Sequence, residues 1–92
     1  MKIVKSKKAA KKYDAYFKLD NGKEKVVSFG QRGASDYTIH GDDERKERYL
    51  RRHRARENWE NPLTAGSLSR WILWDKKSLK ASIAKFKRKF KL

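Results

Sequence analysis

The stretch Asp36–Trp74, which reads DYTIHGDDERKERYLRRHRARENWENPLTAGSLSRWILW, decides the fold of this 92-residue chain. It contains all three tryptophans, both histidines and the only proline. Aromatic side chains bury a large area per residue, which a chain this short needs in order to form a core. The stretch is therefore predicted to be the folded scaffold of a single domain.

A charged helix is predicted at the centre of this stretch, from Asp42–Glu44 to about Asn58. Acidic side chains at its start would satisfy free backbone N–H groups and complement the helix dipole. Tyr49, Leu50 and His53 form a narrow apolar stripe, so the helix is expected to pack on one side only.

The basic side chains of this helix leave two interpretations open. Glu44 precedes Arg48 by four residues and Glu47 precedes Arg51 by four, a spacing that predicts ion pairs on a solvated helix. Arginine can also read guanine edges in a major groove, but the interleaved glutamates would face phosphates, so the ion-paired helix is favoured over base reading. Contact with phosphate or with a neighbouring protein stays open. The residues concerned are Arg45, Lys46, Arg48, Arg51, Arg52, Arg54 and Arg56.

The segments on either side of this helix are shorter. Residues 36–41 are predicted to be extended, with Tyr37 and Ile39 on one side. Further along, Thr64 is predicted to cap a short helix that runs to Trp74. This second helix carries two of the tryptophans and is the expected centre of the core or of a protein interface.

A β-hairpin is predicted before the scaffold, over residues 13–29. Asp20-Asn21-Gly22 supplies turn chemistry between two strands, because Asn-Gly tolerates the positive φ values of a tight hairpin. A lone hairpin is marginally stable in water, so it is expected to pack on the helices. The predicted class is α+β, a small domain with an N-terminal β-hairpin on two to three helices and basic arms at both ends.

The net charge of +15 is concentrated at the two ends of the chain. Residues 1–12 carry six lysines and no acid, and residues 76–92 carry seven lysines, one arginine and no acid. Residues 13–75 carry twelve basic and eleven acidic side chains. The chain therefore divides into a basic N-terminal arm (1–12), a compact α+β domain (13–75) and a basic amphipathic helix or arm (76–92), and runs of like charge commonly bind polyanions.

The two basic ends differ in their apolar content. Residues 1–12 have too few apolar side chains to order themselves and are predicted to be mobile. Residues 76–92 repeat apolar side chains at helical spacing, which predicts an amphipathic helix. That helix could dock on the core, lie on an anionic membrane or fill a partner's groove, and docking on the core is the default. Its apolar residues are Leu79, Ile83, Phe86 and Phe90.

Several functional classes are not supported by the sequence. There is no cysteine, and residues 30–35 lack the spacing of a phosphate-binding loop. His40 and His53 lack further ligands at a known metal-site spacing, and His53 is expected in the core. The protein is predicted not to be an enzyme, with no catalytic residue, no metal site, no cofactor and no small-molecule substrate. A small nuclease is a third hypothesis that would need a metal centre or a carboxylate cluster.

Three motifs, FGQRGASDYTIH, YLRRHRARENW and TAGSLSRWILW, resemble a family of short basic proteins encoded by large DNA viruses of algae and protists. The resemblance covers about residues 25–79 and leaves out much of the basic ends. The function of that family is uncharacterised, so the resemblance implies a setting rather than an activity: a virus with a large capsid and a long genome.

The leading hypothesis is a non-enzymatic virion structural protein of the minor capsid or cement type. It would bind capsid or other virion proteins, and DNA or an anionic membrane surface through its basic arms. It would reside in the virion, and in the host nucleus or cytoplasm during assembly. The alternative is a nucleic-acid-binding protein for genome condensation or transcription, which predicts affinity that falls steeply with salt.

Two groups of residues are assigned to these roles. The polyanion- or partner-binding residues are Lys2, Lys5, Lys7, Lys8, Lys11, Lys12, Arg51, Arg52, Arg54, Lys80, Lys85, Lys87, Arg88, Lys89 and Lys91. The protein-docking residues are Tyr37, Tyr49, Trp59, Trp71, Trp74, Phe86 and Phe90.

Overall fold

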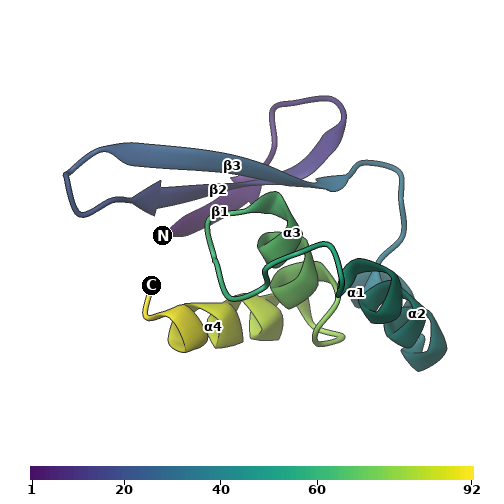
Figure 1. Cartoon of the computed structure of the whole chain (residues 1–92). Helices are drawn as coiled ribbons and strands as arrows, with labels where there is room; N and C mark the ends of the chain where they lie inside the picture. Colours follow the sequence, from purple (N-terminus) through teal and green to yellow (C-terminus); the bar gives the residue numbers. More distant parts are fainter.

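The computed structural model describes every residue from Met1 to Leu92 and contains an antiparallel sheet with helices on one of its faces (Figure 1). Three strands form the sheet in the order β1 (Lys2–Lys5), β2 (Lys11–Lys18) and β3 (Glu24–Gln31). The helices all follow β3 in the sequence. The predicted α+β class and the single domain are confirmed.

The strands β2 and β3 form the predicted hairpin, with Tyr13 opposite Phe29. The turn contains Gly22, whose φ of 83° lies in the left-handed region that glycine adopts without steric cost. Each strand continues two residues past its predicted outer end, to Lys11 and Gln31. This extension places the start of β2 and the end of β3 beside the helices.

The N-terminal segment differs from its prediction. The composition of residues 1–12 predicts a mobile arm, whereas in the structure β1 pairs with β2 in antiparallel register. Ile3 lies opposite Ala15 on the face that packs against the helices. The segment is ordered because the edge of β2 offers backbone groups that pair with it. The lysines of residues 1–12 therefore belong to the sheet and its loop.

The loop between β1 and β2 is fastened to the end of the sheet. The hydroxyl of Ser28 donates a hydrogen bond to Asp14 (Oγ to Oδ1, 2.6 Å). Hydrogen bonds from Ser28 and Ser6 hold the pKa of Asp14 below its usual value. Arg32, in the loop after β3, donates a hydrogen bond to the backbone carbonyl of Ser6 at 3.0 Å. Arg32 also donates to the carbonyl of Lys11, so it holds the loop.

A single helical turn, α1 (Tyr37–His40), replaces the extended segment predicted there. The carboxylate of Asp36 accepts a hydrogen bond from the N–H of Thr38 at 2.9 Å. Gly41 ends the turn at a φ of 61°. The local cap therefore outweighs the alternation of apolar residues that suggests a strand.

The second helix, α2 (Asp43–His53), begins as predicted because Asp42 accepts hydrogen bonds from two N–H groups of the first turn. It ends five residues before Asn58, the predicted end. Beyond the helix, Glu57 turns back towards the ring of His53. The shorter helix leaves a hollow beside its last turn.

Two more helices complete the layer. Thr64 caps α3 (Ala65–Leu68) as predicted, and the chain continues directly as the π-helical segment η1 (Ser69–Leu73). Ser78 caps the last helix, α4 (Leu79–Phe90). In Figure 1, α3 and α4 lie beneath the sheet and α2 projects beyond its end.

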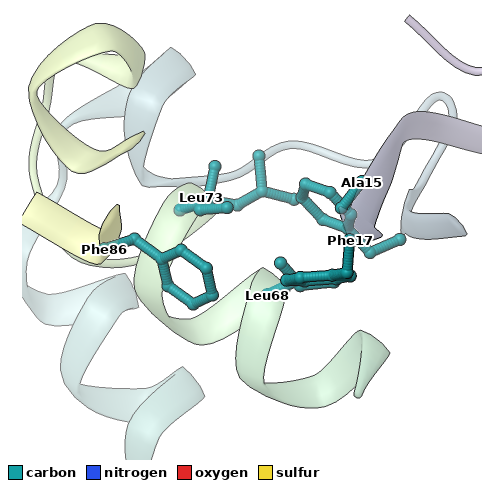
Figure 2. Close-up of a cluster of buried hydrophobic side chains, with 7 residues drawn as sticks. Ala15, Phe17, Leu68, Leu73 and Phe86 are labelled. Carbon is teal, nitrogen blue, oxygen red and sulfur yellow. The ribbon is translucent and has the colours of Figure 1, made fainter. Parts of the chain in front are cut away.

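The core lies between the sheet and the helices (Figure 2). Phe86 of α4 is 1% exposed in this core, so α4 docks on its own domain, as the default interpretation predicts. No helix is long and apolar enough to cross a membrane. The buried cluster consists of Ala15, Phe17, Phe29, Leu68, Ile72, Leu73 and Phe86.

Candidate anion-binding groove

A groove runs between α2, the loop that follows β3, the adjacent end of the sheet, and the α3–η1 segment. The pocket beside the end of the sheet and His53, here called the inner pocket, has a volume of about 460 Å³, and the pocket beside Arg45 and Arg48, here called the outer pocket, has a volume of about 320 Å³. The two pockets share four lining residues and are therefore adjacent. The shared residues are Ala34, Ser35, Arg52 and Trp74.

One wall of the groove is a stripe of arginines on α2, here called the arginine stripe: Arg45, Arg48 and Arg52. Their spacing of three and four residues places them on one face of the helix. At a rise of about 1.5 Å per residue, the stripe spans about 10 Å. All three side chains are exposed, and none makes a salt bridge or a side-chain hydrogen bond.

The ion pairs predicted along α2 are not formed. No salt bridge joins Glu44 to Arg48 or Glu47 to Arg51. The two glutamates line a neighbouring shallow hollow together with Asp43, Arg48 and Arg51. No acid of α2 lines the groove itself, but Arg48 lies between the groove and the acidic hollow and lines both.

The opposite wall comes from the start of β2 and the loop after β3. The ammonium of Lys12 contacts the buried carboxylate of Asp36 at 2.5 Å. Asp36 also accepts hydrogen bonds from Thr38, so its charge is already engaged. Lys11 lines the same wall, and its ammonium has no acidic partner.

Three stacked rings lie under the groove. Tyr49 of α2 is parallel to Trp74, with ring centroids 4.3 Å apart and an interplanar angle of 3°. His53 stacks on the other face of Tyr49, also at 4.3 Å. Burial raises the pKa of the Tyr49 hydroxyl above its usual value of 10. The stack joins α2 to the end of η1 and sets the position of the arginine stripe.

Glu57 fixes the imidazole at the inner end of the groove. Its Oε1 lies 3.3 Å from Nδ1 of His53, and its Oε2 accepts a hydrogen bond from the indole of Trp59 at 2.7 Å. Gly66 lies directly against this carboxylate, since a Cβ there would be 2.8 Å from Cδ of Glu57. The glycine therefore gives Glu57 the space to reach His53.

The balance of charge in the groove favours an anion. The only two acids that line it are Asp36 and Glu57, and each is engaged by a neighbouring residue. The cations without an acidic partner are Lys11, Arg45, Arg48 and Arg52. A phosphate could bind these cations without displacing an ion pair.

The groove contains only some of the predicted polyanion-binding residues. Lys11, Lys12 and Arg52 line it, but Arg45 and Arg48 were not assigned to that role. Their spacing from Arg52 is the signal that marks the shared face. The remaining assigned residues lie on the β1–β2 segment, on another face of α2 or at its C-cap Arg54, and on α4 or at its C-cap Lys91.

The aromatic residues predicted to dock a partner serve mainly the chain's own packing. Tyr37, Tyr49 and Phe86 are at most 7% exposed, so they are not available to a partner. Trp74 is held in the ring stack. Phe90 packs against Phe86 with centroids 4.9 Å apart. The prediction of an aromatic docking surface is therefore wrong for the three buried rings.

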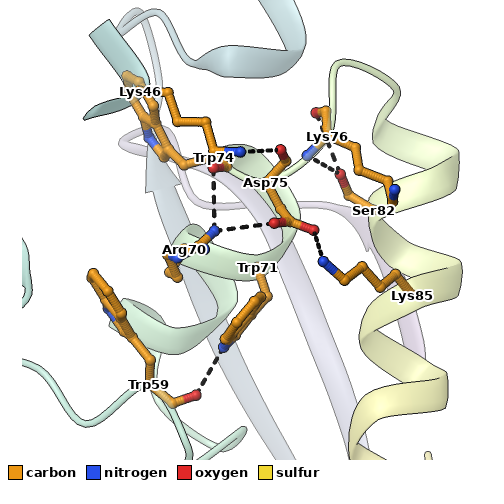
Figure 3. Close-up of polar contacts among 9 residues, drawn as sticks. All are labelled: Lys46, Trp59, Arg70, Trp71, Trp74, Asp75, Lys76, Ser82 and Lys85. Atoms are coloured by element: carbon orange, nitrogen blue, oxygen red, sulfur yellow. Dashed lines mark hydrogen bonds and ion pairs between the residues drawn. The ribbon is translucent and has the colours of Figure 1, made fainter. Parts of the chain in front are cut away.

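A second polar cluster lies under η1 and holds the helices together (Figure 3). Asp75 binds Arg70 at 3.3 Å and Lys85 of α4 at 2.9 Å. Arg70 lies over the ring of Trp71, 4.3 Å from its centroid. The indole of Trp71 donates to the backbone carbonyl of Trp59 at 2.8 Å. These residues are engaged with one another, so the cluster is a structural element.

The structure brings no three histidine, aspartate or glutamate side chains together in a way that could hold a metal ion. A model of a protein family of unknown function matches residues 1–53, which comprise the sheet, α1 and α2. No curated protein and no solved structure matches the chain. The matched segment supplies the arginine stripe and the lysine wall of the groove.

Proposed function

The chain belongs to the family DUF5754, whose function is unknown, and we propose that it is a non-enzymatic nucleic-acid-binding protein. The groove would hold the phosphate backbone between the arginine stripe and Lys11. The observation that carries this proposal is the gathering of four cations without acidic partners in one groove.

The chemistry of the groove suits phosphodiesters. A guanidinium can donate two parallel hydrogen bonds to a phosphate, and such charge-assisted bonds are stronger than neutral ones. The net charge of +15 adds long-range attraction for any polyanion and speeds its approach. Net charge alone does not favour one surface, so the proposal depends on the position of the arginines.

Replacing the arginine stripe by glutamine (R45Q, R48Q and R52Q together) is expected to weaken nucleic-acid binding about a hundredfold near physiological salt, because three phosphate contacts disappear. The slope of log affinity against log salt should become shallower by about two, at roughly 0.7 per phosphate of a single strand. Fluorescence anisotropy with a labelled oligonucleotide over a range of salt measures both quantities.

The matched control removes the same charge from outside the groove, by R51Q, R54Q and R56Q together. These three arginines are exposed and do not line the groove. The control is expected to lose much less affinity than the stripe variant. Equal losses in the two variants would show that binding follows net charge and would contradict the proposal.

A second candidate is a structural protein in the particle of a large DNA virus, bound to capsid proteins. It is supported by the sequence resemblance and by the face of the sheet that the helices leave open. Val4 and Val26 are 38% and 48% exposed on that face, and Lys2 lies over the ring of Tyr16 beside them. Mass spectrometry of purified particles tests this candidate, and absence of the chain from them would contradict it.

A further inference from the structure

We infer that the groove binds single-stranded rather than duplex nucleic acid, with one unpaired base in its inner pocket against the imidazole of His53. This inference rests on the proposed function and names its substrate class. Two features of the groove support it: the direction in which the arginine stripe faces, and the free side of the His53 ring.

The arginine stripe faces into a groove rather than outwards from a convex surface. Arg45 and Arg52 share this groove with Ser35 of the loop and with Trp74. A helix reads a duplex by entering a major groove about 12 Å wide, which requires its reading face to project. Here the loop after β3 stands opposite that face, and the end of the sheet stands opposite Arg52. A single strand, by contrast, can follow the groove along the stripe of about 10 Å.

The inner pocket offers a ring on which a base can stack. Tyr49 covers one face of His53, no other ring of the protein lies on the second face, and the side chain is 39% exposed. A base on that second face would extend the existing stack of Trp74, Tyr49 and His53. Stacking of bases on aromatic side chains beside a basic groove is a general mode of single-strand binding.

The inner pocket is also large enough for a base, and the His53 ring that lines it has a fixed orientation. Its volume of about 460 Å³ lies within the range of roughly 300–1,000 Å³ that is usual for small-molecule sites. Two glycines, Gly30 and Gly66, line it with backbone rather than side chain. Glu57 sets the orientation of His53 before any ligand arrives. The ring is therefore held in place at the point where the strand would pass the last arginine.

The test compares three probes of equal length, about 12 nucleotides, which lies within the usual site size. They are a labelled thymidine strand, the same strand with abasic sugars in place of every nucleotide, and a duplex. The intact strand is expected to bind about tenfold more tightly than the abasic strand, and also more tightly than the duplex. Equal affinity for the intact and abasic strands, or tighter binding of the duplex, would overturn the inference.

Two variants test whether the imidazole of His53 causes the preference for the intact strand over the abasic strand. His53→Ala is expected to bring the ratio of intact to abasic affinity close to one, whereas His53→Phe, which keeps a ring, should preserve the ratio. An unchanged ratio in His53→Ala would remove His53 from the site. Failure of the proposed function looks different: the stripe variant and its matched control would then lose the same affinity for every probe.

Discussion

Replacing Asp75 by alanine is expected to lower the free energy of unfolding by about 3–5 kcal/mol, the usual cost of breaking a buried ion pair from one side. The carboxylate is 8% exposed and binds both Arg70 and Lys85. The side chain of Arg70 is itself only 12% exposed. Without Asp75, a buried guanidinium would have no counter-charge. Urea unfolding at neutral pH measures the difference.

Glu60 supplies the control for this variant. Its side chain is 74% exposed and lies 3.8 Å from Lys89, so Glu60→Ala should change the unfolding free energy by less than about 1 kcal/mol. Similar small effects for Asp75→Ala and Glu60→Ala would contradict the structural role assigned to Asp75.

The same carboxylate also gives the stability a dependence on pH. Burial alone would raise the pKa of Asp75, but the hydrogen bond and charge of Lys85 and the charge of Arg70 bring it below its usual value of 3.8. A lowered pKa in the folded state means that the stabilisation is complete above about pH 4 and is lost as the pH falls further. Asp75→Ala should remove this part of the acid sensitivity.

Phe86→Ala is expected to destabilise the protein by about 3–5 kcal/mol, the usual range for a buried phenylalanine. Phe86 is 1% exposed and ties α4 to the cluster beneath the sheet (Figure 2). The result bears on function. If α4 bound a membrane or a partner instead of the core, Phe86→Ala would change the free energy of unfolding only a little. Val26→Ala, at an exposed position of the sheet, serves as the control and should cost less than about 1 kcal/mol.

Local chemistry made much of the fold predictable. The Asn-Gly turn placed the hairpin, and the side chains of Asp42 and Thr64 capped the two helices whose starts were predicted. The spacing of apolar residues in α4 identified the face that Phe86 buries. In each case the signal and the structure lie within a few residues of one another.

Tertiary contacts decided the features that were not predicted. Strand β1 has little apolar content and is ordered by the edge of β2, not by its own sequence. The one-turn helix α1 depends on the Asp36 cap, which competes with an extended pattern. The early end of α2 coincides with the contact between Glu57 and His53.

The groove was predictable only in part. The spacing of Arg45, Arg48 and Arg52 is visible in the sequence and places them on one face. The sequence does not say that the loop after β3 and the residue Trp74 stand against this face, or that Glu44 and Glu47 line a neighbouring hollow without forming ion pairs. The acids between the arginines therefore suggested ion pairs within the helix. In the structure Arg45, Arg48 and Arg52 make no salt bridge.

The most direct test of the account is to map where a single strand binds, by following backbone amide chemical shifts in a titration with a short oligonucleotide. The account predicts the largest shifts in residues 34–36, 45–53 and 65–74, which surround the groove. The exposed lysines of β1 and α4 should shift little at the same ratio of strand to protein. Shifts concentrated on β1 and α4, with the groove unchanged, would contradict it.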